Sequence, residues 1–135
     1  MPHVLDEAIR LVPAGEHTYT GATHPAYANM VGPFGGTTCA VLLNAVLLHP
    51  MRLGDPIAQT VNYAGPIADG PFEVEAVPTR TNRSTQHWNL KLTQDGMVCA
   101  SGSAVFAKRR ETWSVQEAVP PQDMPPASSL SRLPT

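Results

Sequence analysis

The sequence has few charged residues, few aromatic residues and only two cysteines, and these shortages exclude several classes of protein. Charged side chains make up 15% of the 135 residues, with nine basic against eleven acidic groups. Binding to a nucleic acid or an anionic membrane needs clustered Lys and Arg, so neither partner is expected. The one basic run, Lys108 to Arg110, is typical of a solvated strand end, with a docking patch for an anionic ligand as the alternative.

The two cysteines, Cys39 and Cys99, lie in apolar stretches without a CxxC motif or a neighbouring histidine. This context is typical of small buried side chains. The first residues contain no apolar segment of the signal-peptide type, and the longest uncharged apolar run, residues 37–48, is too short to cross a bilayer. The sequence therefore predicts a cytoplasmic protein that folds without a disulfide or a metal ion.

Proline and serine divide the chain into two parts. Five of the fourteen prolines fall in the last sixteen residues, and this end of the chain has almost no large apolar side chains. Such a segment cannot bury enough surface to fold alone. We expect one folded domain over residues 1–113 and a linker or docking tail over residues 114–135.

The hydrophobic pattern of the first part predicts an α+β fold. The longest predicted helix, residues 37–49, has Asn44 as its only polar side chain between Thr38 and His49, so it must be covered on most sides. Alternating patterns predict strands that can cover it as one antiparallel sheet wrapped around a central hydrophobic helix. A short helix is expected over residues 4–11, and strands over residues 16–23, 56–63, 72–80, 83–93 and 97–108.

Four segments carry a resemblance to a known family, and they read YANMVGPFGGTT (27–38), AGPIADGPF (64–72), TNRSTQHW (81–88) and AVFA (104–107). In this order they resemble the N-terminal half of thioesterase-superfamily proteins related to acyl-CoA thioesterase II, over about residues 5–113. The resemblance implies a hot-dog fold and hydrolysis of acyl-CoA thioesters without a metal or an organic cofactor. It also implies a homodimer, or pairing with a second hot-dog unit.

The Gly35-Gly36 pair before the central helix is the strongest candidate for chemistry. Glycines allow close approach of a ligand, and the free N–H groups of a helix start can hold the oxyanion that forms on a thioester carbonyl. The alternative is a tight turn that allows close packing. Thr37 and Thr38 either cap the helix or donate to the thioester.

The remaining candidates are weaker. Asn29 matches, through the resemblance, an Asn that positions substrate or water, with a turn residue as the alternative. Gln86 is polar on an apolar strand face, so it either pairs with buried backbone or reaches a cleft. The predicted catalytic residues are Asn29, Gly35, Gly36 and Thr37, and the predicted substrate-binding residues are Phe34, Thr38 and Gln86. No metal site is assigned, because His24 and His87 lack ligand partners at useful spacing.

The sequence departs from the family at the catalytic acid. Residues 37–49 contain no Asp or Glu, and Leu43 stands where single-domain relatives carry a carboxylate. In two-domain relatives the Asp, Thr and Gln of the site lie in the second half and match no residue here. Three hypotheses follow: an acyl-CoA thioesterase with its site at a dimer or paired-domain cleft, a non-catalytic half that requires a second hot-dog domain with the catalytic Asp, and an acyl-CoA hydratase or dehydratase.

Overall fold

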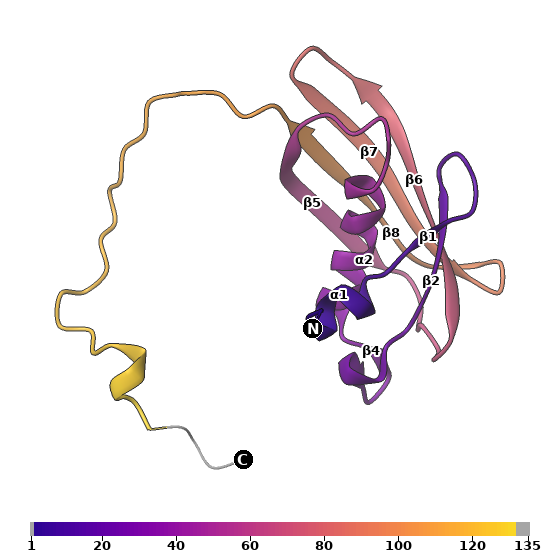
Figure 1. The fold of residues 1–135 in the computed structure, drawn as a ribbon, viewed down its shortest axis with the longest axis horizontal. Helices are drawn as coiled ribbons and strands as arrows, with labels where there is room; N and C mark the ends of the chain where they lie inside the picture. The colour runs from indigo at the N-terminus through magenta and orange to yellow at the C-terminus, as the bar shows by residue number, and fades with distance from the viewer. Residues whose placement is uncertain (1, 132–135) are drawn as a thin grey trace.

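A curved antiparallel sheet with one long helix on its concave face makes up most of the protein (Figure 1). The computed structural model describes residues 2–131. Three helical elements and the β3–β4 hairpin accompany the sheet and its helix. In chain order the elements are α1 (Val4–Ala8), β1 (Val12–Pro13), β2 (Thr18–Ala22), the 3₁₀ turn η1 (Pro25–Tyr27), β3 (Ala28–Asn29), β4 (Gly32–Pro33), α2 (Gly35–Leu47), β5 (Asp55–Tyr63), β6 (Pro71–Thr81), β7 (Thr85–Gln94), β8 (Met97–Ala107) and the 3₁₀ turn η2 (Ala127–Ser129).

The strand order of the sheet is β1-β2-β6-β7-β8-β5, and every neighbouring pair is antiparallel. The last three strands in sequence form consecutive hairpins, whereas β5 pairs with β8 at the far side. One edge of the sheet is therefore the two-residue β1 and the other is the nine-residue β5. The predicted α+β architecture and the four predicted C-terminal strands are confirmed to within two residues at each end, whereas β1, β3 and β4 fall in segments where we expected no strand.

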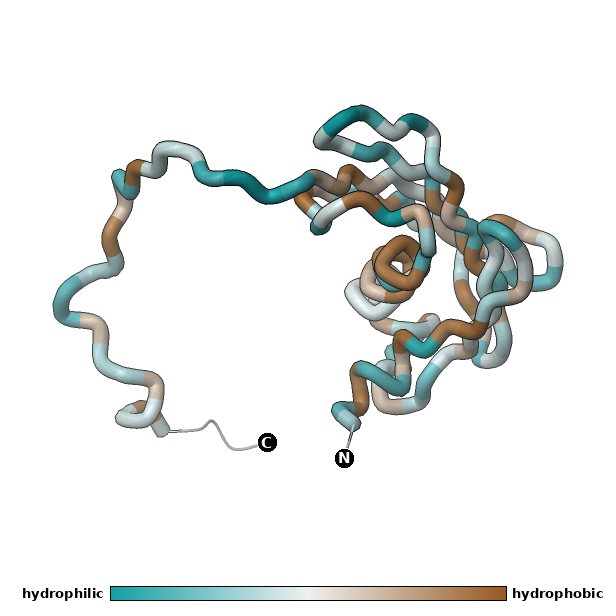
Figure 2. Tube along the Cα trace, turned by 45° about the horizontal axis from the view of Figure 1, so that its top comes forward, coloured by the Kyte–Doolittle hydropathy of each residue, from teal (hydrophilic) through white to brown (hydrophobic). Residues whose placement is uncertain are grey.

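Helix α2 packs against the inner face of the sheet and supplies the centre of the hydrophobic core. Val41, Leu42, Ala45 and Val46 are buried, and they meet alternate residues of the strands. Figure 2 shows the helix end-on, as an apolar coil partly enclosed by the sheet. Asn44, its isolated polar residue, donates to the carbonyl of Ile9 at 2.8 Å and thereby ties α1 to α2. The core side chains include Tyr19, Phe72, Val74, Ala76, Trp88, Leu90, Leu92, Ala104 and Phe106.

A histidine pair lies where α2 ends. His49 is 3% exposed, and its Nδ1 accepts from the N–H of Met51 at 3.1 Å, so the neutral ring carries its hydrogen on Nε2. That Nε2 lies 2.9 Å from Nδ1 of His17, which must then be the acceptor. Burial and the neighbouring His17 lower the pKa of His49, against a weaker opposite effect of Glu16. This shift favours the neutral form of His49.

Acid is expected to weaken the fold through His49. Because the pKa of His49 is lower in the folded chain than its usual value of about 6.5, its stabilising effect is complete above that pH and declines as the pH falls toward the folded pKa. Urea unfolding between pH 7.5 and pH 5 measures this as a falling free energy of unfolding. The variant His49→Gln, which does not titrate, should show a shallower decline. An equally steep decline in the variant would assign the effect to other groups.

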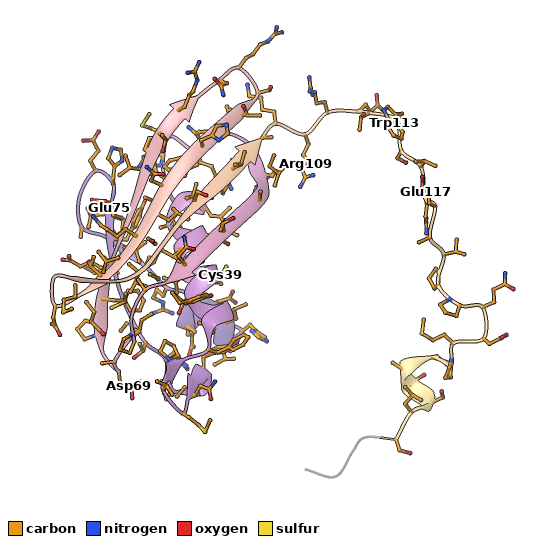
Figure 3. The ribbon with its side chains drawn as sticks, turned by 180° about the vertical axis from the view of Figure 1, so that it is seen from behind. Cys39, Asp69, Glu75, Arg109, Trp113 and Glu117 are labelled. Carbon is orange, nitrogen blue, oxygen red and sulfur yellow. The ribbon has the colours of Figure 1, made fainter. Side chains whose placement is uncertain are left out.

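The chain continues beyond the sheet as an extended arm. All described residues from 108 to 131 are exposed, and η2 is the one helical element among them. Figures 1 and 3 show this arm leaving the end of β8 and running away from the domain, with Trp113 and Glu117 on it. The proposed division at residue 113 implies that residues 1–113 fold without the rest of the chain.

Ending the chain at Trp113 should leave the melting temperature within about 2 °C of the full-length value, because the described residues that are lost cover no core side chain. Differential scanning calorimetry of the two chains measures the difference. A loss of more than about 5 °C would show that the tail packs on the domain and would contradict the division.

Candidate functional site

The start of α2 is presented by the β3–β4 hairpin, whose tip carries Met30 and Val31. These side chains are 96% and 81% exposed. Gly32 has a φ of +144°, and a Cβ there would lie 2.7 Å from the carbonyl oxygen of Ile67, so glycine allows the hairpin to contact the β5–β6 connection. The N–H of Phe34 donates to the carbonyl of Tyr27 at 2.8 Å. The hairpin thus fixes the direction in which the chain enters the helix.

The helix begins at Gly35, two residues earlier than predicted, so both glycines lie in its first turn. Phe34 is the N-cap residue, and no side chain caps this end. The first N–H that meets an acceptor is that of Thr37, which donates to the carbonyl of Phe34 at 2.9 Å. Within residues 2–131 the N–H groups of Gly35 and Gly36 have no acceptor, and they lie at the positive end of the helix dipole. Two free donors at the positive end of a helix dipole are able to bind an anionic group.

Thr37 and Thr38 lie inside the first turns rather than before them, so their predicted alternative role as helix caps is wrong. Both side chains are buried, at 6% and 4% exposed. In the described part of the chain the hydroxyl of Thr37 is the single buried side-chain polar atom without a partner. It lines a small cavity of about 10 Å³ with Tyr27 and His24, which is room for one water-sized group.

Edge strand β5 holds the helix start through two polar side chains. The hydroxyl of Tyr63 donates to the carbonyl of Gly35 at 2.6 Å. One turn further along, Nε2 of Gln59 donates to the carbonyl of Cys39 at 3.0 Å, and the Cys39 thiol donates back to Oε1 at 3.1 Å. Figure 3 shows Cys39 on α2 beside β5. Burial, and to a smaller extent Cys39, raises the pKa of Tyr63, so its phenol remains a donor at neutral pH.

A cleft of about 200 Å³ opens between the hairpin and the β5–β6 connection. Asn29 and Thr38 line it, together with Tyr63 from the sheet edge. Among the residues that the structure describes, none in its lining is charged, which suits an uncharged group such as a thioester and its neighbouring atoms. The complete lining is Asn29, Met30, Val31, Gly32, Pro33, Thr38, Tyr63, Gly65, Pro66 and Ile67.

The structure brings most of the predicted site residues to this end of α2. Asn29 is exposed at the hairpin, and its Oδ1 accepts from the N–H of Met30 at 2.8 Å, as in the turn alternative. Phe34 is 58% exposed, and its ring covers Gly36, where a Cβ would lie 2.4 Å from Cε1. Gln86 is not among them. It lies beyond the other end of α2, 1% exposed, and bonds the backbone of Met51 and Leu53.

Acidic side chains are absent from the lining of the cleft and of the small cavity within the described residues. Asp55, at the start of β5, has a carboxylate oxygen 3.9 Å from Nε of Arg109. Asp69 is exposed in the turn before β6 (Figure 3). Potential metal ligands form no group of three or more in the same residues.

Sequence reasoning missed Tyr63 and the Gly32–Ile67 contact. Tyr63 ends an alternating strand immediately before the Ala-Gly-Pro turn, so its place at a strand end was readable. The contact between Tyr63 and Gly35 could not be predicted, because this contact depends on β5 lying at the sheet edge beside the helix start. The described chain also contains no helix with the length and apolarity that a membrane span needs.

Comparison with known proteins gives a consistent result. A model of the acyl-CoA thioesterase N-terminal domain matches residues 24–107. A hot-dog protein of unknown function from Alicyclobacillus acidocaldarius is 49% identical, with a TM-score of 0.93 over 100% of this chain and 50% of that one. No curated protein matches.

Two more distant solved structures share the fold. A putative thioesterase II from Thermobifida fusca is 22% identical, with a TM-score of 0.80 over 92% of this chain and 46% of that one. An acyl-CoA thioesterase II from Mycobacterium marinum is 20% identical, with a TM-score of 0.70 over 96% and 55%. The expected hot-dog fold is confirmed, and the chain spans about half the length of these three relatives.

Proposed function

The chain belongs to the family of acyl-CoA thioesterase N-terminal domains, and on this premise we propose that it hydrolyses acyl-CoA thioesters at a cleft formed with a second hot-dog unit. The observation that carries the proposal is the pair of free N–H groups at Gly35 and Gly36 beside an uncharged cleft. Water would attack the thioester carbonyl carbon, the carbon–sulfur bond would break, and the products would be a carboxylic acid and the CoA thiol. The two donors would stabilise the oxyanion formed in between.

The residues of this chain would have separate roles in that reaction. The N–H groups of Gly35 and Gly36 would bind the developing oxyanion. Thr37 would offer its unpartnered hydroxyl to substrate or water, while Asn29, Phe34 and Thr38 would contact the bound thioester. Because the cleft lining holds no carboxylate in the described chain, the proposal assigns the base that activates water to the paired unit.

The long edge of the sheet supports pairing. No described strand pairs with the outer side of the nine-residue β5, and such an edge can add another strand. Ile57 and Tyr63 on this strand are 52% and 56% exposed, and Leu48, at the end of the neighbouring helix, is 50% exposed. A second unit on this side would bury these apolar side chains and bring its own residues to the start of α2. The proposed tail would then run alongside that unit.

The second candidate is a hot-dog half that binds acyl-CoA and requires a partner unit for turnover. It is favoured by the same missing carboxylate. A hydratase or dehydratase stays a lesser proposal, because among the described residues the cleft lining holds neither the Asp nor the His that it would need, and the small cavity holds His24 without an Asp.

Incubating the purified chain with acyl-CoAs of several lengths and a thiol reagent tests the proposal, with sedimentation velocity on the same sample. Turnover by a homodimer would support hydrolysis by this chain. A dimer that binds acyl-CoA without turnover would support the second candidate. Absence of both binding and turnover would contradict both.

A further inference from the structure

The side chain of Tyr63 lies against the first turn of α2. Its hydroxyl donates to the Gly35 carbonyl at 2.6 Å. A Cβ on Gly35 would lie 3.1 Å from the Tyr63 hydroxyl oxygen and 3.2 Å from Cζ, which is closer than ordinary van der Waals contact. The glycine therefore lets the phenol reach the backbone of the helix start.

The carbonyl that Tyr63 holds belongs to the same peptide unit as the N–H of Gly36. A trans peptide is planar, and its C=O and N–H point in opposite directions. The described chain has no cis peptide bond. Fixing the carbonyl of Gly35 therefore also fixes the direction of the Gly36 N–H, one of the two free donors.

Tyr63 supports this peptide from outside the helix. The peptide joins two glycines, which have the widest range of backbone angles of any residue, and no side chain caps the helix at this point. A hydrogen bond to the carbonyl also polarises the amide and makes its N–H a stronger donor. Gln59 supports the next turn in the same way through Cys39. Strand β5 therefore orients the helix start as well as packing beside it.

We propose that Tyr63 is a positioning residue, which aligns and polarises the Gly36 N–H for the oxyanion through the carbonyl of Gly35. The inference rests on the proposed function and adds to it a residue outside the helix. It assigns Tyr63 no contact with the reacting atoms. It also gives edge strand β5 a part in the chemistry of the cleft.

The test uses Tyr63→Phe in the full chain, with Tyr19→Phe as the matched control. Tyr19 is a core residue of β2 and 3% exposed, so its variant reports the general cost of losing a phenol hydroxyl. Two-dimensional ¹H–¹⁵N spectra should show the Gly36 amide shifted upfield and exchanging faster with solvent in Tyr63→Phe alone. Steady-state hydrolysis should show kcat reduced about tenfold with KM changed less than twofold, since a misaligned donor loses part of its transition-state stabilisation.

The two readouts separate the two proposals. No hydrolysis by the wild-type chain, alone or with a partner unit, contradicts the proposed function, while the Gly36 amide still reports on Tyr63. An unmoved Gly36 amide in Tyr63→Phe overturns the positioning role. Amide shifts spread over the whole sheet, with a rise in KM equal to the fall in kcat, would show a merely structural role and would overturn it as well.

Discussion

Replacing Gln86 by leucine is expected to lower the free energy of unfolding by about 3 kcal/mol, because its buried amide uses all of its hydrogen-bonding capacity. Oε1 accepts from the N–H of Leu53 at 2.8 Å and from Nε1 of Trp88 at 3.0 Å. Nε2 donates to the carbonyl of Met51 at 3.0 Å and to Oγ1 of Thr81 at 2.8 Å. Leucine would fill most of the volume and leave all four groups without this partner.

The cost is dominated by Trp88, which is 1% exposed and out of reach of water. The melting temperature should fall by about 10 °C, as measured by calorimetry or by circular dichroism. Gln94→Leu is the matched control, since Gln94 bonds Ala68 and Pro71 at the surface, where water can replace it. We expect it to cost about 1 kcal/mol. Equal losses in the two variants would contradict the structural assignment of Gln86.

Replacing Gly35 by proline is expected to reduce thioester hydrolysis by about a hundredfold while preserving the fold, because it deletes one oxyanion donor. Gly35 is the first residue of α2, the position at which a helix accepts proline best. Phe34, which would precede the proline, already has the extended angles that proline requires, with φ −55° and ψ 128°. The N–H is therefore removed without breaking the helix.

Gly35→Ala is the matched control, because it adds the same Cβ beside Tyr63 and keeps the N–H. The ratio of kcat/KM between the alanine and proline variants isolates the donor, and the melting temperatures of both verify the fold. Similar rates in the two variants would contradict the oxyanion role of Gly35. Should turnover require a partner unit, the comparison is made in the presence of that unit.

The core of the fold could be predicted because its pattern is local. Strands β6, β7 and β8 alternate cleanly, and their connections are short, so pairing follows from sequence order. The start of α2 was placed two residues too late because Gly35 and Gly36 have low helix propensity, and tertiary contacts from Tyr63 override it. The small β3–β4 hairpin carries no alternating pattern and was indistinguishable from a loop.

The candidate site was predictable only where residues adjoin in sequence. Residues 34–38 were found because one helix start brings them together. For Gln86 the sequence allowed two roles, a hydrogen bond to buried backbone or a place in a cleft. Which of the two applies depends on which end of α2 lies against Gln86, and the sequence does not reveal this. The contact of Tyr63 depends on β5 crossing to the far edge of the sheet. A contact between residues so far apart in the chain produces no periodic hydrophobic pattern in a single sequence.

The pairing of β5 with β8 also has a consequence for the order in which the chain folds. The register joins Asp55 to Ala107 across the whole β6–β8 meander, so this pairing closes a much longer loop than the hairpins do, although the pairing of Thr18 with Glu75 between β2 and β6 closes a longer one still. The hairpins between β6, β7 and β8 can form first, whereas β5 can pair only after β8 is in place. Strand β5 and the helix start that it holds should then close after the hairpins and open before them, and native-state hydrogen exchange should find the amides of β5 less protected than those of β7. The cleft would in that case open more readily than the β6–β8 meander, without global unfolding.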